Sequence, residues 1–134
     1  MDKGLEMFDW TFSTRRRHLL RLLDLLSSLE EHLILYRDGH DEVISPHAFA
    51  LVMRDGNSSV EGLYNYLENR GIQCKTLFGS LATQHKAFAF LGYREGDFPV
   101  AERIGHTGLH FGIHQYLTEE DIEYAAESIQ AYFA

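Results

Sequence analysis

Cysteine and lysine are scarce in this chain of 134 residues, which has one cysteine and three lysines. Cys74 alone cannot form an internal disulfide, and a chain without disulfides suits a reducing compartment. We therefore expect a cytoplasmic protein. With only Lys3, Lys75 and Lys86 available, any chemistry that needs a lysine has few candidates.

Long apolar runs and an excess of basic charge are also lacking. The longest uniform apolar run, residues 48–53, is far shorter than the roughly 20 residues that span a bilayer. The first residues have no apolar core behind a basic end, so we expect no signal peptide. The net charge of −8 argues against a nucleic acid or an anionic membrane as partner, since both attract basic surfaces.

The residues that are plentiful predict a packed core. Hydrophobic residues make up 45% of the chain and aromatic residues 13%, which excludes a disordered protein. The length fits a single domain. We expect residues 1–12 to form a lead-in with little pattern and residues 13–134 to form one small domain.

Leucines at three- and four-residue spacing predict a helix from residue 13 or 14 to Leu29. The leucine stripe is broad, and we expect part of residues 19–29 to be an exposed apolar patch that faces something outside this chain. Three arginines, residues 15–17, lie at the predicted helix start and oppose the helix dipole. The conflict would vanish if the helix began earlier or if these arginines paired with carboxylates.

The rest of the chain alternates short strands with helices. Apolar residues on both faces of 47–54 predict a strand covered on both sides. A second strand is expected at 72–78, after Gly71 ends a helix, and a third helix begins with Pro99 in its first turn. The other predicted features are an apolar run at 33–36, a helix capped by Ser58 with Glu61, an irregular segment at 79–92 with a helical turn near 85–90, a strand at 109–113, and a last helix capped by Thr118 with Asp121.

This order of elements predicts an α+β fold. We expect a small, mostly antiparallel sheet of three to four strands, with helices packed mainly on one face.

Three histidines recur at every fourth position, His106, His110 and His114. On a continuous helix they would share a face and could bind a metal ion. Interleaved glycines weaken a helix there, and on a strand the neighbouring histidines are too far apart to share one ion. We expect no metal site, and we favour a pocket-lining role for His110 or His114. A histidine-dependent metal protein is the weaker alternative.

Other catalytic patterns are weak. Cys74 as a nucleophile would need a base and an orienting group that the sequence does not locate, so a buried thiol is the better interpretation. Neither glycine-rich phosphate-binding pattern occurs. Lys75, in a predicted strand, is the lysine whose surroundings best suit chemistry, although a lysine on the surface of a strand edge fits at least as well.

Several segments together resemble one family. Residues 68–75, 92–103 and 109–122 are similar, in order and spacing, to the C-terminal small domain of the DegT/DnrJ/EryC1/StrS sugar aminotransferases. Arg15–His18 resembles the start of that family's interdomain helix. Residues 78–84 are closest to the branch that contains the 3-dehydrases of nucleotide-linked deoxysugars.

The resemblance implies an aspartate-aminotransferase-like enzyme whose large domain holds pyridoxal phosphate. That large domain has no counterpart here, so we expect no catalytic, cofactor-binding or metal-binding residue in this chain. The substrate-binding residues implied for an assembled enzyme are Lys75, Phe78, Gly79, Ser80, His110 and His114. Two positions depart from the family: Lys75 and Thr83 stand where arginine is common, and a lysine holds an anion only as a point charge.

Three hypotheses follow. The first is a detached C-terminal domain of a nucleotide-sugar aminotransferase or 3-dehydrase of deoxysugar, lipopolysaccharide or other surface polysaccharide synthesis. It would be inactive alone and would meet a nucleotide sugar only in an assembled enzyme, with a large-domain chain as partner. The second is a non-catalytic interaction or oligomerisation module that self-associates as a dimer. The third is the histidine-based metal protein.

Overall fold

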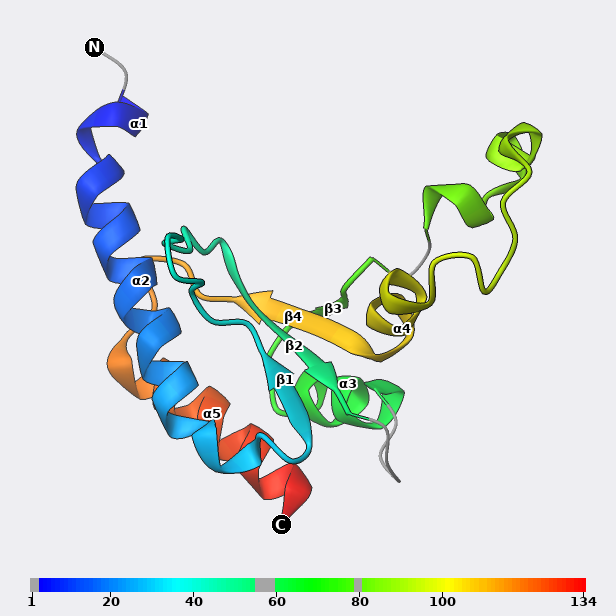
Figure 1. Cartoon of the computed structure of the whole chain (residues 1–134). Coiled ribbons are helices and arrows are strands. Elements are labelled where there is room, and N and C mark those ends of the chain that lie inside the picture. The colour runs from blue at the N-terminus through cyan, green and yellow to red at the C-terminus, as the bar shows by residue number, and fades with distance from the viewer. Residues whose placement is uncertain (1–2, 55–59, 79–80) are drawn as a thin grey trace.

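The computed structural model describes residues 3–54, 60–78 and 81–134. A four-stranded antiparallel sheet forms its centre, in the order β1-β2-β4-β3 (Figure 1). Within the described ranges, no helix has both the length and the apolar character that crossing a membrane requires. The strands are β1 (Leu33–Leu35), β2 (Ala48–Met53), β3 (Cys74–Thr76) and β4 (Gly108–Gly112). The helices are α1 (Lys3–Glu6), α2 (Phe8–Leu25), α3 (Val60–Glu68), α4 (Pro99–Thr107) and α5 (Glu119–Phe133), with short 3₁₀ turns at Ser27–Leu29, Ala82–Gln84 and Lys86–Leu91.

One face of the sheet carries the hydrophobic core. Phe49 lies opposite Phe111 and Leu51 lies opposite Leu109 across the β2–β4 ladder, and all four side chains are buried. Side chains alternate along a strand, so these residues point to the same face. Residues from α2, α3 and α5 bury apolar side chains in the same core. The predicted α+β fold, with helices mainly on one face, is confirmed.

Helix α2 begins earlier than the sequence pattern indicates. Residues expected to form a lead-in are helical in α1 and in the first turns of α2, which begins at Phe8. The arginines at residues 15–17 therefore lie in the middle of a helix rather than at its start. Their conflict with the helix dipole is removed in this way.

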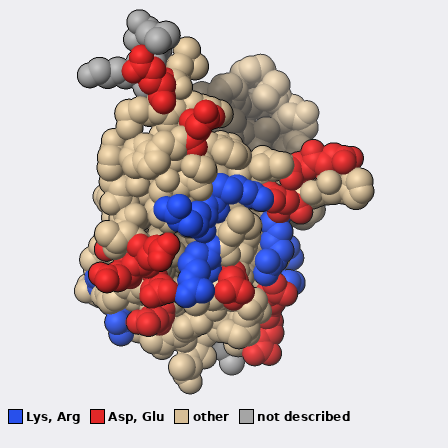
Figure 2. All heavy atoms as spheres, turned by 90° about the vertical axis from the view of Figure 1, so that its left-hand side faces the viewer, with Lys and Arg blue, Asp and Glu red and all other residues tan. Residues whose placement is uncertain are grey.

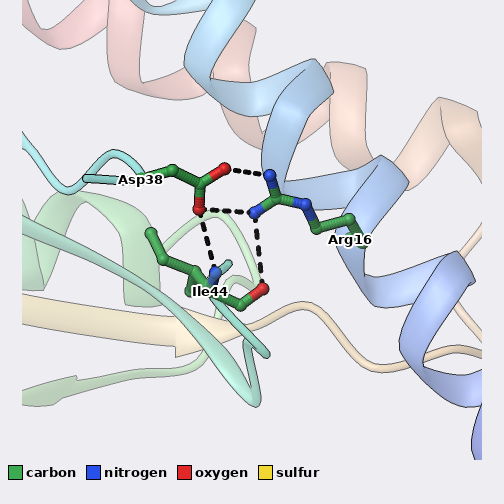
Figure 3. Close-up of polar contacts among 3 residues, drawn as sticks. All are labelled: Arg16, Asp38 and Ile44. Carbon is green, nitrogen blue, oxygen red and sulfur yellow. Dashed lines mark hydrogen bonds and ion pairs between the residues drawn. The ribbon is translucent and has the colours of Figure 1, made fainter. Parts of the chain in front are cut away.

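Arg16 is also paired with a carboxylate. Figure 3 shows the Arg16 guanidinium contacting both carboxylate oxygens of Asp38 and donating to the Ile44 carbonyl oxygen at 3.3 Å. The Asp38 carboxylate accepts the Ile44 backbone N–H at 2.9 Å. These contacts tie α2 to the loop between β1 and β2. Figure 2 shows basic and acidic side chains interspersed over the side of the molecule that lies on the left in Figure 1. Arg21 of α2 pairs with Glu123 of α5 at 2.6 Å.

The expected exposed patch at 19–29 is wrong. Leu19, Leu22, Leu23 and Leu26 are buried in the chain's own core, and Leu20 is the exposed leucine of this stretch. The stripe is broad because these leucines share one core with residues of the sheet, α3 and α5. Most of the exposed large apolar side chains of this chain therefore lie outside residues 19–29.

The second face of the sheet is only partly covered. Ala48, Ala50 and Val52 of β2 are half-buried rather than buried, so the strand is not enclosed on both sides as expected. Helix α4 lies across one end of this face, where Ala101 and Ile104 approach β2. We call the surface formed by Ile34, Ala48, Ala50, Val52, Lys75 and His110 the open face.

The predicted helix signals are mostly confirmed. Gly71 has a φ of 77° after α3, and Pro99 occupies the first turn of α4. Thr118 caps α5, accepting the Asp121 backbone N–H at 3.2 Å. The predicted Ser58 cap lies outside the described residues.

Candidate functional site

Two of the predicted site residues meet on the open face. Lys75 of β3 lies directly opposite His110 of β4 in the antiparallel ladder. Ala50 of β2 lies opposite His110 on its other side. Because β3 is an edge strand, Lys75 is exposed to solvent while His110 is half-buried.

A second histidine joins this pair. The rings of His47 and His110 lie at right angles with their centroids 6.1 Å apart. Burial lowers the pKa of His110, and the neighbouring His47 and Lys75 lower it further. His110 is therefore neutral at pH 7 and can donate or accept a hydrogen bond next to the Lys75 ammonium. Two small residues flank the group: Ala50 pairs with His110, and Gly112 lies two residues further along β4.

No pattern in the sequence identifies His47 as a neighbour of His110. It stands at the start of a predicted strand 63 residues before its neighbour. The sheet order, which places β2 beside β4, brings them together. Strand order depends on the whole fold, so the position of His47 before a strand does not predict its contact with His110.

Phe78 lies beyond the end of β3 in an unusual conformation. Its φ of 52° is in the left-handed region, which an aromatic residue seldom adopts, and its side chain is 75% exposed. Backbone strain of this kind often accompanies a binding or switching role. The neighbouring residues Gly79 and Ser80, also predicted to bind substrate, lie outside the described residues.

Helix α4 holds the Phe78 segment through a glycine. A Cβ atom at Gly105 would lie 2.9 Å from the Phe78 carbonyl oxygen, closer than real contacts allow. Gly105 therefore lets α4 approach the backbone at Phe78. The same helix is fixed at its start by Glu102, whose carboxylate accepts the Gly96 backbone N–H at 2.9 Å.

An apolar pocket of about 510 Å³ lies between α4, the Phe78 segment and the open face. Its lining includes Ile34, Val52, Leu77, Phe78 and Ile104, together with one charged residue, Arg103. Sequence reasoning missed this pocket because its walls come from four segments that are distant in sequence.

His114 is not part of this group. It follows β4 and lines a separate pocket of about 400 Å³ together with Gln73 and Asp121. Its Nδ1 accepts the Tyr116 backbone N–H at 3.3 Å. The structure thus brings His110 to Lys75 but leaves His114 elsewhere.

The histidines are also separated as metal ligands. His106 lies on α4, His110 on β4 and His114 in the loop that follows. Among the described residues, no three histidine, cysteine or carboxylate side chains are placed to hold a metal ion. The metal-protein alternative therefore has no geometric support in the described part of the chain.

Cys74 is a buried residue of the core. Burial raises the pKa of its thiol to about 12, with a further contribution from the Glu68 carboxylate. The thiol donates to the Ile72 carbonyl oxygen at 3.3 Å. Since the thiolate is the nucleophile, this environment opposes a catalytic role.

The described lysines do not fit a pyridoxal phosphate site. A lysine that forms a Schiff base needs a desolvated environment that lowers its pKa. The side chains of Lys75 and Lys86 are both exposed. Neither Lys75 nor Lys86 therefore has the surroundings of a Schiff-base lysine, and we derive no reaction step through pyridoxal phosphate.

Comparisons with known proteins identify close similarities. A model of the DegT/DnrJ/EryC1/StrS aminotransferase family matches residues 2–130. A dTDP-4-dehydro-2,6-dideoxy-D-glucose 3-dehydratase from Saccharopolyspora spinosa is 32% identical over 124 residues, which cover 91% of this chain and 27% of the relative.

Solved structures share the fold. S. venezuelae DesV, solved with a ketimine intermediate, superposes with a TM-score of 0.85 and 20% identity over 96% of this chain and 33% of DesV. The E. coli GDP-4-keto-6-deoxy-D-mannose-3-dehydratase was solved with bound hydrated pyridoxal phosphate. It superposes with a TM-score of 0.79 and 21% identity over 94% of this chain and 32% of the enzyme. The chain thus spans about a third or less of the length of these relatives.

Proposed function

The chain belongs to the DegT/DnrJ/EryC1/StrS aminotransferase family, whose members depend on pyridoxal phosphate, and from this premise we propose that it is the detached C-terminal small domain of a nucleotide-sugar aminotransferase or 3-dehydrase. Residues 13–134 form that domain, and it acts in the cytoplasm in deoxysugar or surface polysaccharide synthesis. One observation carries the proposal: nearly the whole chain superposes on DesV with a TM-score of 0.85 yet covers only 33% of it.

In this proposal the chain supplies substrate contacts and a separate large-domain chain supplies the cofactor. The neutral His110 imidazole and the Lys75 ammonium, paired across β3 and β4, suit an anionic group such as the diphosphate of a nucleotide sugar. Phe78 contributes a further substrate contact, and His114 contributes one from its separate pocket. Gly79 and Ser80, which lie outside the described residues, stay predicted contacts.

The test compares the activity of the chain alone with its activity in the presence of a large-domain chain. The pure chain is incubated with pyridoxal phosphate and an amino donor, and its absorbance spectrum and product formation are recorded. We expect no specific cofactor spectrum and no turnover with the chain alone. We expect turnover of a dTDP-4-keto-deoxysugar when a large-domain chain is added. A cofactor spectrum with turnover by the chain alone would contradict the proposal.

Substitution of Lys75 tests the substrate contact. In the reconstituted enzyme, Lys75→Ala should raise the KM for the nucleotide sugar, whereas Lys75→Arg should retain or lower it because a guanidinium can hold phosphate with two hydrogen bonds. Arg17→Ala is the control, since Arg17 is a basic residue of α2 whose side chain is 61% exposed and lies outside the open face.

The second candidate function is a non-catalytic interaction module. It is favoured by exposed aromatic side chains on the segment that follows β3, including Phe88 and Phe90. The two candidates differ in one outcome: an interaction module would bind a partner without restoring sugar-nucleotide turnover.

A further inference from the structure

The exposed apolar side chains of this chain are concentrated at two places. One is the arm, which we define as residues 81–98, together with Phe78 before it and α4 after it. The exposed apolar residues of the arm and these two flanking parts are Phe78, Phe88, Phe90, Leu91, Tyr93, Phe98 and Val100, with Phe90 80% exposed. The other is α1 with the start of α2, where Leu5, Phe8 and Trp10 are exposed.

These two places flank the open face. Figure 1 shows the start of α2 and the arm projecting beyond the sheet, one at each end. The apolar pocket of about 510 Å³ lies between the open face and the base of the arm. A surface that reaches from one end of the molecule to the other matches a partner of domain size better than a short peptide.

The arm, taken with the flanking Phe78 segment and α4, also differs from the rest of the chain in charge. Residues 78–107 carry three basic and three acidic residues, so the net charge of −8 comes entirely from other segments. Aromatic side chains are enriched in protein–protein interfaces. Contiguous exposed apolar patches mark interaction sites in monomeric proteins.

The arm contributes nothing to the core of this chain. None of residues 81–98 is buried. Its form is nevertheless defined: Glu102 and Asp97 accept backbone N–H groups within it, and the rings of Tyr93 and Phe98 pack with centroids 5.0 Å apart. A segment that is locally ordered but does not pack on the core of its own domain is suited to packing against another domain.

We propose that the arm, the open face and the exposed start of α2 together form the docking surface for a separate large-domain chain, with the aromatic arm as its main anchor. The proposal rests on the proposed function, because the occupant is the two thirds of the family fold that this chain does not span. A second copy of the chain is the alternative occupant, which sedimentation of the chain alone tests.

The experiment measures binding to a defined probe. The probe is the S. spinosa 3-dehydratase lacking the segment that matches this chain, with its fold verified by pyridoxal phosphate absorbance. Titration calorimetry should give a Kd of about 1 µM for the wild-type chain. The double variant Phe90→Ser/Leu91→Ser should weaken binding by about tenfold or more, since aromatic anchors dominate interface energies.

A matched control lies on α2. Leu20 is 49% exposed and Leu91 is 47% exposed, so Leu20→Ser removes a similar apolar surface away from the arm. It should leave binding unchanged. Circular dichroism melting of every variant verifies that each one is folded.

Three outcomes would overturn the proposal. One is a wild-type chain that does not bind the probe at about 100 µM. Another is an equal loss of binding for the Leu20 and arm variants. The third is sedimentation of the chain alone showing a dimer that the arm substitutions dissociate, which would make a second copy the occupant.

Binding and turnover separate the two proposals. If turnover is restored but the arm variants bind as the wild type does, the proposed function stands and the docking surface is wrong. If binding depends on the arm but no nucleotide-sugar turnover follows, the docking surface stands and the proposed function is wrong.

Discussion

At the scale of single residues, burial decides the chemistry of Cys74. The side chain is 2% exposed, and burial together with Glu68 raises its pKa to about 12. Because the thiolate is the reactive form, we expect Cys74 to react with Ellman's reagent about a thousandfold more slowly at pH 8 than a free cysteine. Absorbance at 412 nm reports the reaction, and the same chain in guanidinium chloride is the control. Rapid labelling of the native chain would contradict the buried position.

Asp38 carries the clearest pH dependence. The hydrogen bonds from Arg16 and from the Ile44 backbone lower its pKa below the ordinary 3.8. Its contribution to stability is therefore present above pH 3.8 and is lost as the pH falls through the lowered pKa of the folded state.

We expect Asp38→Asn to lower the free energy of unfolding at pH 7, with a difference from wild type that disappears in strong acid. Urea denaturation across this pH range measures both effects. Asp41→Asn is the control, because that carboxylate is 91% exposed and pairs with an exposed histidine. A difference between Asp38→Asn and wild type that stays constant with pH would show that the Asp38 charge is not responsible.

At the scale of elements, Gly105 sets the distance between α4 and the Phe78 segment. Alanine favours a helix over glycine by about 1 kcal/mol, so Gly105→Ala would stabilise α4 if space were available. The new Cβ would lie 2.9 Å from a backbone oxygen, which cannot move as easily as a side chain.

We therefore expect Gly105→Ala to lower the melting temperature and to displace Phe78, measured by calorimetry and by the chemical shifts of residues 76–78. Val100→Ala, at a position 68% exposed on the same helix, should change little. A higher melting temperature for Gly105→Ala would mean that the close approach is absent in solution.

The sequence predicted elements where one local signal sufficed. Pro99 marked the start of α4, Gly71 followed the end of α3, and Thr118 with Asp121 marked the start of α5. It placed the start of α2 wrongly, because the first turns of α2 lack the leucine spacing of its later part. The pairing of Arg16 with Asp38, 22 residues away, also depends on how the loop folds back, which no local pattern encodes.

At the scale of the whole molecule, the sequence could not indicate which apolar residues are exposed. The leucines of α2 form a continuous pattern, and they are buried by α5 and the sheet. The aromatic residues of the arm form no such pattern, and they are exposed. Burial depends on the packing of distant segments, and strand order depends on the whole fold. The pairing of Lys75 with His110 and the apolar pocket beside it both depend on these features, so the sequence alone did not predict them.

The uneven burial predicts an uneven stability. Local opening requires little free energy where few apolar groups are buried, and it approaches the global value in the core. Amides of β2 and β4, which pair at the centre of the sheet, should exchange with deuterium slowest in the free chain. Amides of residues 82–98 should exchange fastest among the described elements, because none of these residues is buried.

Hydrogen-exchange mass spectrometry with and without the large-domain probe measures both states. Binding should slow exchange in the arm by stabilising its folded form, while the outer surface of α2 around Leu20 should change little. An arm already protected like β4 in the free chain would mean that it packs on its own domain. Its aromatic side chains would then be unavailable to a partner.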